Sequence, residues 1–411
     1  MSKYILLTGA TGFVGQYLLR DLLLEGMPVA VLIRSAGQES ALERLERVMS
    51  HWEAALSRNL PRPVCLEGDI TLAGLGLTME ARLWAAKHCA ALLHNAASLT
   101  FFGKDRKEDP WLSNLTGTEN VLQFCRQAGV RHLHYMSTAY VCGKRPGTVL
   151  ESELDHDHGF RNDYENCKFE AEKLVRSASF LDSLTVYRPA TIVGDSRTGY
   201  TTTYHGLYSY LQFVWMLRQY ANLQEDGRWH IPVRLNVTGD ECRNLISVDW
   251  VSAVTAYLVL KPEHHGRTYH LTPLEPVTAR EIEEAMCSHF GYYGPTFVGP
   301  DGLAEGALNE VERLFYEYVE RYTPYWAQEP TFDCTNTRTA APHLPCPRID
   351  TACLHRLIDF AIQDRWGKKK TRRQPDKETR KPEESEKTRR QGDKETRRPE
   401  SSTPFAAPSY P

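Results

Sequence analysis

The feature that most constrains this sequence is a glycine-rich turn within its first fifteen residues, "LLTGATGFVG" from Leu6 to Gly15. An apolar run leads into the turn and apolar residues at helical spacing follow it, as where a strand leads into a helix. Glycines at positions 9, 12 and 15 permit a tight turn, the approach of backbone to a pyrophosphate, and close helix–strand packing, respectively. The positive end of the helix would face the phosphates. The sequence therefore predicts a dinucleotide-binding turn.

Strand and helix patterns alternate through the first half of the chain. Short apolar runs such as "PVAVLIR" (28–34) are separated by amphipathic segments such as "ESALERLERVMSHWEAAL" (39–56). This alternation predicts an α/β fold of the Rossmann type, a doubly wound parallel sheet with helices on both faces. We assign residues 1–195 to the nucleotide-binding domain. Residues 196–366, rich in aromatic residues, glycine and proline, are assigned to a smaller C-terminal substrate lobe with elements that return to the first domain.

The last part of the chain, residues 367–411, differs from the rest in composition. It holds 14 Lys and Arg against 8 Asp and Glu, and an imperfect repeat begins at Thr371 and again at Thr388. Almost nothing in it is apolar, so it cannot offset the entropy of ordering, and we predict a disordered tail. A basic arm that binds nucleic acid or an acidic surface is the alternative; the mixed charge favours a solvated tail.

Composition limits the class of protein further. The net charge of −3 gives no indication of a nucleic-acid partner, and no apolar run is long enough to span a bilayer. Ten scattered cysteines, none in a C-x-x-C pair, and the lack of a secretory leader lead us to expect a cytoplasmic protein with free thiols. The "DHDHG" stretch at Asp155–Gly159 has no partnering His or Cys cluster, so no metal is predicted.

The end of the second predicted strand distinguishes between the two nicotinamide dinucleotides. Chains that bind NAD usually place Asp or Glu there, against the ribose hydroxyls. This strand ends "VLIRS", which places Arg34 at that position. A guanidinium suits a 2′-phosphate in charge and in geometry, so we predict NADPH. A solvated surface arginine is the alternative.

Further cofactor contacts are expected at the ends of the next strands. Asp69 in "LEGDI" is placed to accept a hydrogen bond from the adenine amino group, and the small residues of "HNAA" let the backbone pass close to the cofactor. The residues expected to contact the cofactor are Gly9, Thr11, Gly12, Phe13, Val14, Gly15, Arg34, Asp69, Ile70, Asn95, Ala96, Ala97, Tyr164, Lys168 and Pro189.

A candidate catalytic group follows. In "DYENCKFEAEKL", Tyr164 and Lys168 are four residues apart and share one helix face. An ammonium and a nicotinamide cation near a phenol would lower its pKa, which lets Tyr164 exchange a proton as hydride moves. Thr138 would donate a hydrogen bond to the carbonyl oxygen of the substrate with which Tyr164 exchanges its proton. Asn114 would bind a water or a backbone group that relays protons from the lysine. A surface helix pair is the alternative, which the preceding dinucleotide turn disfavours.

Taken together, "TGATGFVG", "LEGDI", "HNAA", "NLTGT", "STA" and Tyr164-x-x-x-Lys168 resemble the extended short-chain dehydrogenases/reductases over roughly residues 3–365. The resemblance implies a Rossmann sheet with strand order 3-2-1-4-5-6-7 and a C-terminal substrate lobe. It also implies a catalytic Thr-Tyr-Lys group with an Asn helper, at Thr138, Tyr164, Lys168 and Asn114.

Finer motifs, above all "RPATIVGDSRTG" (188–199), are similar to the thioester-reductase branch, which includes carboxylic acid reductase terminal domains, peptide-synthetase release domains and fatty acyl-CoA reductases. This implies NADPH-dependent reduction of an acyl thioester, carried by coenzyme A or an acyl carrier protein, to aldehyde or alcohol. A nucleotide-sugar epimerase or dehydratase, a hydroxysteroid-type dehydrogenase and a binding module without turnover are the alternatives. The aromatic stretch 199–219 is interpreted as core, with an acyl tunnel as the alternative, and Cys167 stands where serine commonly precedes the lysine. The acyl chain, the donor and the oligomeric state stay open.

Overall fold

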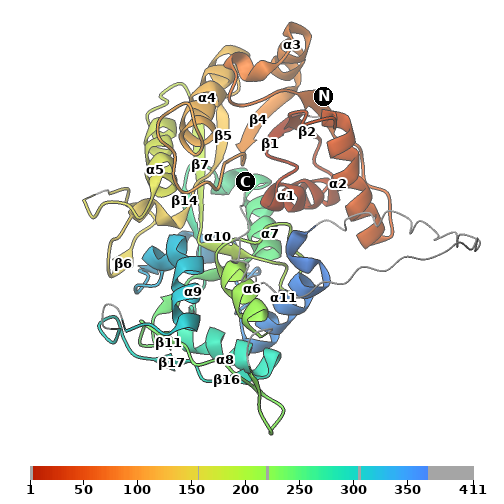
Figure 1. Cartoon of the computed structure of the whole chain (residues 1–411). Coiled ribbons are helices and arrows are strands. Elements are labelled where there is room, and N and C mark those ends of the chain that lie inside the picture. The colour runs from red at the N-terminus through yellow and green to blue at the C-terminus, as the bar shows by residue number, and fades with distance from the viewer. Residues whose placement is uncertain (1–2, 156, 219–221, 304–306, 369–411) are drawn as a thin grey trace, which may run out of the picture. The chain divides into compact units, whose positions relative to one another are not determined.

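A seven-stranded parallel sheet forms the centre of the protein (Figure 1). The structure is a computed structural model that describes residues 3–155, 157–218, 222–303 and 307–368. In spatial order the strands are β3 (Val64–Glu67), β2 (Val29–Ile33), β1 (Tyr4–Thr8), β4 (Cys89–His94), β5 (His132–Met136), β7 (Ser183–Pro189) and β14 (Thr268–Leu271). Counted along the chain within this sheet, the order is 3-2-1-4-5-6-7. The predicted fold class and strand order are therefore confirmed.

Helices cover both faces of the sheet (Figure 1). One face carries α1 (Phe13–Leu24), α2 (Ala41–Leu56) and α7 (Val248–Val259), and the other carries α3 (Met79–His88), α4 (Gly117–Ala128) and α5 (Asp163–Arg176). Successive residues of a strand point to opposite faces. Accordingly, Ile5 and Leu7 pack into the core beneath α1, whereas Leu6 packs into the core beneath α4. The near-continuous apolar strands follow from burial on both faces.

The second half of the chain builds a further core. Its helices are α6 (Leu207–Leu217), α8 (Ala279–Phe290), α9 (Glu310–Val319), α10 (Thr335–Ala340) and α11 (Thr351–Gln363). Short strands accompany them: β6 (Thr148–Val149), β8 (Thr191–Val193), β9 (Asn222–Leu223), β10 (Trp229–His230), β11 (Arg234–Leu235), β12 (Cys242–Arg243), β13 (Leu245–Ser247), β15 (Val277–Thr278), β16 (Tyr292–Tyr293), β17 (Thr296–Phe297) and β18 (Thr331–Phe332). In α6, Leu211, Phe213 and Val214 are buried in this core, as expected for that part of the stretch 199–219, whose last residue lies outside the described residues.

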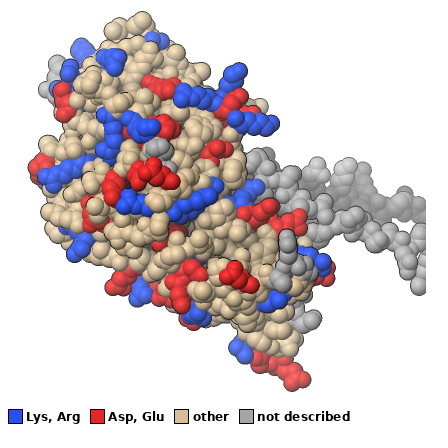
Figure 2. Space-filling model, turned by 90° about the vertical axis from the view of Figure 1, so that its left-hand side faces the viewer, with Lys and Arg blue, Asp and Glu red and all other residues tan. Residues whose placement is uncertain are grey.

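Elements of the later half return to the sheet and its helices. β14 pairs with β7, and α7 packs beside α1. Residues up to Lys368 form one compact unit. The predicted disordered tail, apart from Gly367 and Lys368, lies outside the described residues. In the described part of the chain no helix is long and apolar enough to cross a membrane. Figure 2 shows positive and negative side chains interspersed on the face that it presents.

The distinctive "GDSRTG" motif is a structural turn. The Asp195 carboxylate accepts hydrogen bonds from the backbone N–H groups of Arg197 (2.9 Å) and Thr198 (3.0 Å) and from the Tyr17 hydroxyl on α1 (3.1 Å). Gly199 has a φ of +74°, and a Cβ there would lie 2.2 Å from the carbonyl oxygen of Arg356 on α11. The motif therefore fastens the C-terminal helix to the first helix of the chain, and glycine is required for the close approach.

A buried ion pair lies beneath the carboxyl ends of β5 and β7. Arg188 of β7 and Glu172 of α5 both have fully buried side chains, and the shortest distance between the guanidinium and the carboxylate is 2.6 Å. Glu172 also accepts from the Ser137 hydroxyl (2.6 Å) and from Arg176 (2.7 Å). Burial acts to raise the pKa of Glu172, but the two arginines and Ser137 hold it below its ordinary value. The carboxylate thus ties α5 to two strand ends.

Removing the negative charge of this pair should lower the stability of the fold. We expect Glu172→Gln to lower the free energy of unfolding by about 3–5 kcal/mol, because it leaves the Arg188 guanidinium buried without a counter-charge. Urea denaturation followed by circular dichroism measures the loss. Arg131→Ala, which breaks the exposed Arg131–Asp182 pair, is the control and should cost less than about 1 kcal/mol. Equal losses in the two variants would contradict the assignment.

Candidate active site

The glycine turn has the geometry that a dinucleotide requires. Gly9 has a φ of +72°, and a Cβ at this position would lie 2.8 Å from the backbone of Ala96. A Cβ on Gly15 would lie 1.9 Å from the carbonyl oxygen of Gly9, so this glycine packs against the turn itself. By contrast, a Cβ on the exposed Gly12 would approach only the Gly9 oxygen, at 3.3 Å. Gly12 therefore leaves open space where backbone can approach a phosphate.

The first turn of α1 continues this surface. Gly12 is the N-cap of α1, it supplies no side-chain cap, and the first turn carries no acidic residue. The backbone N–H groups at this end are therefore available to an anion. Phe13 and Val14 begin the helix and are half-buried, and Thr11 stands in the turn before it.

Thr8 joins the turn to the segment that follows β4. Its hydroxyl lies 2.9 Å from Nδ1 of His94 and accepts from the backbone N–H groups of Asn95 and Ala96, at 3.1 Å each. The Asn95 side chain donates to the carbonyl oxygen of Gly9 (3.4 Å). Burial lowers the pKa of His94 to about 3, so the imidazole is neutral. The turn and the predicted Asn95–Ala97 segment are thus brought together.

Two arginines, Arg34 and Arg44, lie near the glycine turn. A cavity of about 290 Å³ is lined by Arg34, Ser35, Glu67, Gly68, Asp69, Leu72 and Gly76. Arg34 is largely exposed and lies 3.5 Å from the Asp69 carboxylate. Arg44 of α2 donates one Nη to the Thr11 hydroxyl (3.0 Å) and the other to the carbonyl oxygen of Arg34. Arg44 was not predicted from the sequence, although its place in the first turns of α2 puts it beside the glycine turn.

The other two predicted residues of this region have structural contacts of their own. One oxygen of the Asp69 carboxylate accepts from the backbone N–H (2.8 Å) and the hydroxyl (2.9 Å) of Thr71. Ile70 is buried, and its carbonyl oxygen accepts from the Asn120 side chain (2.8 Å). The exposed turn at Gly12, the uncapped helix start and the cavity lined by Arg34 together fit a dinucleotide.

Tyr164 and Lys168 occupy one face of α5. The helix begins after Asn162, whose side chain accepts from the Glu165 N–H (3.0 Å), and Tyr164 lies half-buried in its first turn. Lys168 is 3% exposed, and its ammonium donates to the carbonyl oxygen of Met136 (2.7 Å) and to the Tyr135 hydroxyl (3.0 Å). The same ammonium lies 4.5 Å from the centroid of the Tyr135 ring. Tyr135, which the sequence analysis did not single out, therefore holds the predicted catalytic lysine.

The expected lowering of the Tyr164 pKa is not produced by these side chains. Burial raises the pKa of Tyr164, and Cys167 and Glu165 raise it further. The reason is geometric, since Lys168 directs its hydrogen bonds to β5. Burial also lowers the pKa of Lys168 to about 8, against the opposing effects of Cys167 and Glu172.

Thr138 lies directly after the end of β5. It is buried, accepts from the Tyr140 N–H (3.3 Å) and donates to the carbonyl oxygen of Pro189 (3.3 Å). The neighbouring Ser137 is engaged with Glu172. The predicted catalytic role of Thr138 stays a prediction.

Asn114 fixes the loop after β4 to the catalytic helix. Its side chain accepts from the Ser98 N–H (2.7 Å) and donates to the Ser98 carbonyl (3.0 Å) and to the Cys167 sulfur (3.4 Å). The Asn114 carbonyl accepts from the Thr118 hydroxyl (2.7 Å). The structure thus gives Asn114 a positioning contact to α5, and its predicted part in a proton relay stays a prediction. The Cys167 thiol also donates a hydrogen bond, to the carbonyl oxygen of Tyr164 (3.2 Å).

The stretch Asp155–Gly159 contains His and Asp residues, but the sequence predicts no metal there. Residue 156 of this stretch lies outside the described residues. Among the residues that the structure does describe, no group of three His, Cys, Asp or Glu side chains is arranged to hold a metal ion.

Comparison with known proteins gives the family. Residues 7–255, more than half of the chain, match the male sterility protein family. This chain belongs to that family. The membership confirms the resemblance that the motifs carry, to extended short-chain dehydrogenases/reductases of the thioester-reductase-like branch.

Individual relatives agree with the family. The nonribosomal peptide synthetase asaC of Aspergillus flavus is 28% identical over 369 residues, which cover 81% of this chain and 34% of that protein. The aldehyde reductase lnaA of Aspergillus flavus is 25% identical over 403 residues, which cover 87% of this chain and 36% of that protein. The chain therefore spans about a third of the length of these relatives.

Solved structures are similar to the whole described fold. The terminal R domain from the myxalamid PKS-NRPS biosynthetic pathway has a TM-score of 0.72 and 26% identity, with 89% of this chain and 91% of that chain covered. A UDP-glucose 4-epimerase of Thermotoga maritima has a TM-score of 0.57 and 17% identity, with 88% and 99% covered. The epimerase shares the fold, and membership of the family indicates a nicotinamide dinucleotide as cofactor.

The buried lysine predicts a specific pH dependence of stability. Below pH 8 Lys168 is protonated in both states, and the full cost of burying its charge is present. Between about pH 8 and the ordinary value of 10.5 the unfolded chain binds a proton that the folded chain has released, so stability rises with pH. We expect the wild type to gain up to about 1.4 kcal/mol per pH unit relative to Lys168→Met in this range, measured by urea denaturation. Lys173→Met, at an exposed position of the same helix, is the control. Wild type and Lys168→Met curves that run parallel would contradict a depressed pKa.

Proposed function

We propose that this chain is an NADPH-dependent reductase of acyl thioesters, which yields an aldehyde or an alcohol. One observation carries the proposal: α5 presents Tyr164 and Lys168 on one face, and the Lys168 ammonium is bonded to the strand end that leads into Thr138. The glycine turn lies at the same carboxyl edge of the parallel sheet, where ligands of such sheets bind. Support comes from relatives named as an aldehyde reductase and as peptide synthetases, and from the similar terminal R domain.

Each residue has a defined task in this reaction. When bound, NADPH supplies a hydride to the thioester carbonyl carbon. Tyr164 and Thr138 donate hydrogen bonds to the carbonyl oxygen and stabilise the negative charge that develops there. For this, the Thr138 hydroxyl turns from the Pro189 carbonyl toward the substrate. Tyr164 then gives its proton to the oxygen. Lys168 supplies one positive charge on the same helix face, and the nicotinamide cation would supply a second, so that the two together would stabilise the phenolate that is left.

The product follows from the chemistry of the carbonyl carbon. The first reduction gives a hemithioacetal, whose carbon–sulfur bond breaks to release a thiol and an aldehyde. A second reduction of the aldehyde gives an alcohol. We propose that the nucleotide binds to residues 1–195 and the acyl group to the lobe of residues 196–366. The thiol that leaves is coenzyme A or the prosthetic group of an acyl carrier protein.

The activity and the role of Tyr164 can be tested together. We expect the protein to oxidise NADPH with acyl-coenzyme A or carrier-bound acyl thioesters, with aldehyde or alcohol identified by mass spectrometry. Tyr164→Phe should lower kcat by about 10²–10⁴-fold, because the proton donor is lost. Tyr4→Phe, at the amino end of β1, is the matched control. Full activity in Tyr164→Phe would contradict the catalytic role, and NAD that co-purifies together with turnover of nucleotide sugars would favour the epimerase alternative.

The two arginines at the cavity predict the cofactor preference. A hydrogen bond between ionised groups contributes about 1.5–3 kcal/mol, which is about 10- to 150-fold in affinity. We therefore expect Arg34→Glu and Arg44→Gln each to weaken NADPH binding by at least about tenfold while NADH binding changes little, as measured by fluorescence titration. Arg47→Glu on the same helix, where Arg47 pairs with Glu39, is the control. An unchanged ratio of the two affinities in Arg34→Glu would refute the assignment of NADPH.

A further inference from the structure

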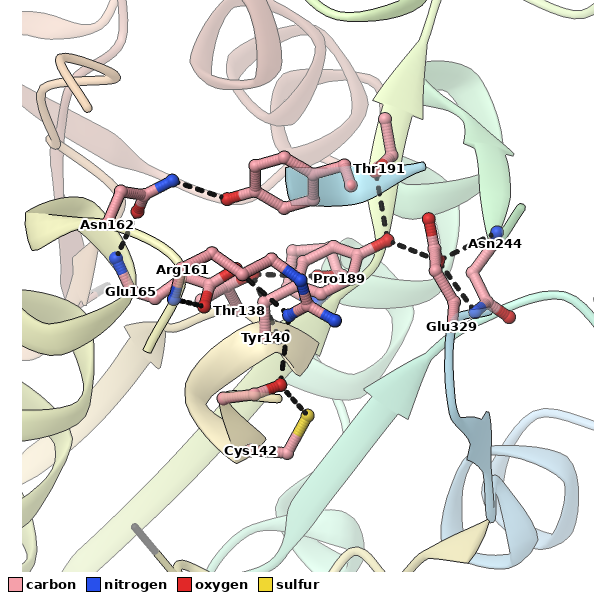
Figure 3. A network of polar contacts seen from close by, with 12 residues as sticks. Thr138, Tyr140, Cys142, Arg161, Asn162, Glu165, Pro189, Thr191, Asn244 and Glu329 are labelled. Atoms are coloured by element: carbon pink, nitrogen blue, oxygen red, sulfur yellow. Dashed lines mark hydrogen bonds and ion pairs between the residues drawn. The ribbon is translucent and has the colours of Figure 1, made fainter. Parts of the chain in front are cut away.

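A buried polar network joins the catalytic region to the segment 320–332, which lies far from it in the sequence (Figure 3). Glu329 of this segment is buried and accepts from the Tyr140 hydroxyl (2.8 Å) and from the side chain of Asn244 (2.9 Å). β18, at the end of the segment, pairs with β6. The end of the segment is thus fixed to Tyr140 in the turn after β5, to Asn244 and to β6.

Tyr325 of this segment contacts the start of the catalytic helix. Its hydroxyl accepts from the Asn162 side-chain amide (2.7 Å). Burial, and then the negative charge of Glu165, raise the pKa of this phenol. Asn162 is the N-cap of α5, and its side-chain oxygen accepts from the Glu165 N–H (3.0 Å). The phenol therefore binds the residue two positions before Tyr164, and the side chain of that residue in turn binds the backbone of the residue directly after Tyr164.

The ring of Tyr325 supports Tyr164 from a second direction. It packs against Phe101 with the ring centroids 5.7 Å apart, and the Phe101 carbonyl accepts from the backbone N–H of Tyr164 (3.2 Å). Phe101 belongs to the loop that Asn114 holds through Ser98. Tyr325 thus contacts both the loop and the helix that flank the Tyr164 backbone, the loop through Phe101 and the helix through Asn162.

A buried cation fixes Tyr325 in turn. The Arg161 guanidinium lies 5.3 Å from the centroid of the Tyr325 ring and 5.9 Å from that of Tyr140. It is almost fully buried, lies 3.2 Å from the Glu165 carboxylate and donates to the Gly143 carbonyl (2.9 Å). Figure 3 shows Arg161 and Glu165 beside Tyr140, and Glu329 of the later half of the chain at the Tyr140 hydroxyl. A buried network in which the partners are mutually satisfied has few alternative arrangements.

We propose that Tyr325 is a positioning residue for Tyr164 and that it couples the substrate lobe to the proton-transfer step. The inference rests on the proposed role of Tyr164 as proton donor. A displacement of a reacting group by about 1 Å lowers a rate by about 10²-fold, so a residue that sets the backbone of the donor influences kcat without touching the substrate. Movement of the segment 320–332 when an acyl group enters the lobe would reach Tyr164 through these contacts.

Tyr325→Phe tests the proposal, because it removes the hydrogen bond between the hydroxyl and Asn162 and keeps the ring. We expect kcat to fall by about tenfold with the KM for NADPH unchanged, since the glycine turn and the two arginines are untouched. Tyr316→Phe is the matched control. It removes a phenol hydrogen bond within the same lobe, to the Arg234 carbonyl (2.7 Å), away from α5. Its kcat should stay that of the wild type.

A second measurement does not depend on turnover. Hydrogen exchange of the backbone amides of residues 163–166 should be faster in Tyr325→Phe than in the wild type and in Tyr316→Phe. If the wild type reduces no thioester but this exchange rises in Tyr325→Phe alone, the proposed function fails while the positioning of α5 is supported. Unchanged kcat and exchange in Tyr325→Phe, or equal changes in Tyr316→Phe, would overturn the inference.

Discussion

The buried ion pair between Arg188 and Glu172 is the interaction on which the geometry of the site depends. Two charges without water are stable only when they are paired, so α5 has one favourable register against β5 and β7. Glu172 follows Lys168 and Tyr164 at intervals of four residues, which places all three on one helix face. The pair therefore fixes α5 against β7, and the Ser137–Glu172 hydrogen bond fixes α5 against the end of β5, beside Thr138.

The fold and the cofactor crevice could be predicted because their determinants are local. Each strand is a short apolar run, each helix has its own apolar period, and the turn at Gly9 and Gly15 requires glycine because backbone passes within contact distance. The sheet order follows once the chain is assigned to a doubly wound fold. The Tyr164–Lys168 spacing is equally local, which is why one helix face could be inferred from the sequence.

The supporting residues could not be predicted, because their contacts join distant segments. The side chains of Tyr135, Arg44 and Tyr325 form hydrogen bonds with Lys168, Thr11 and Asn162, respectively. The hydrophobic periodicity near these three residues does not indicate that they have such partners. The pKa of Tyr164 shows the same limit. From the sequence, the Lys168 ammonium and a nicotinamide cation were expected to lower the pKa of Tyr164. Desolvation depends on tertiary packing, which the sequence pattern does not show, and in this structure it raises the pKa.

The contacts of Lys168 restrict what this residue can do. An ammonium has three N–H bonds, and two of them point at the Tyr135 hydroxyl and the Met136 carbonyl. A single N–H is left for any other acceptor, so the lysine behaves as a donor with one direction. A guanidinium carries the same charge but spreads its donors in a plane, and it could not reproduce this arrangement within a pocket of the same shape. Direction as well as charge is therefore a requirement at this position.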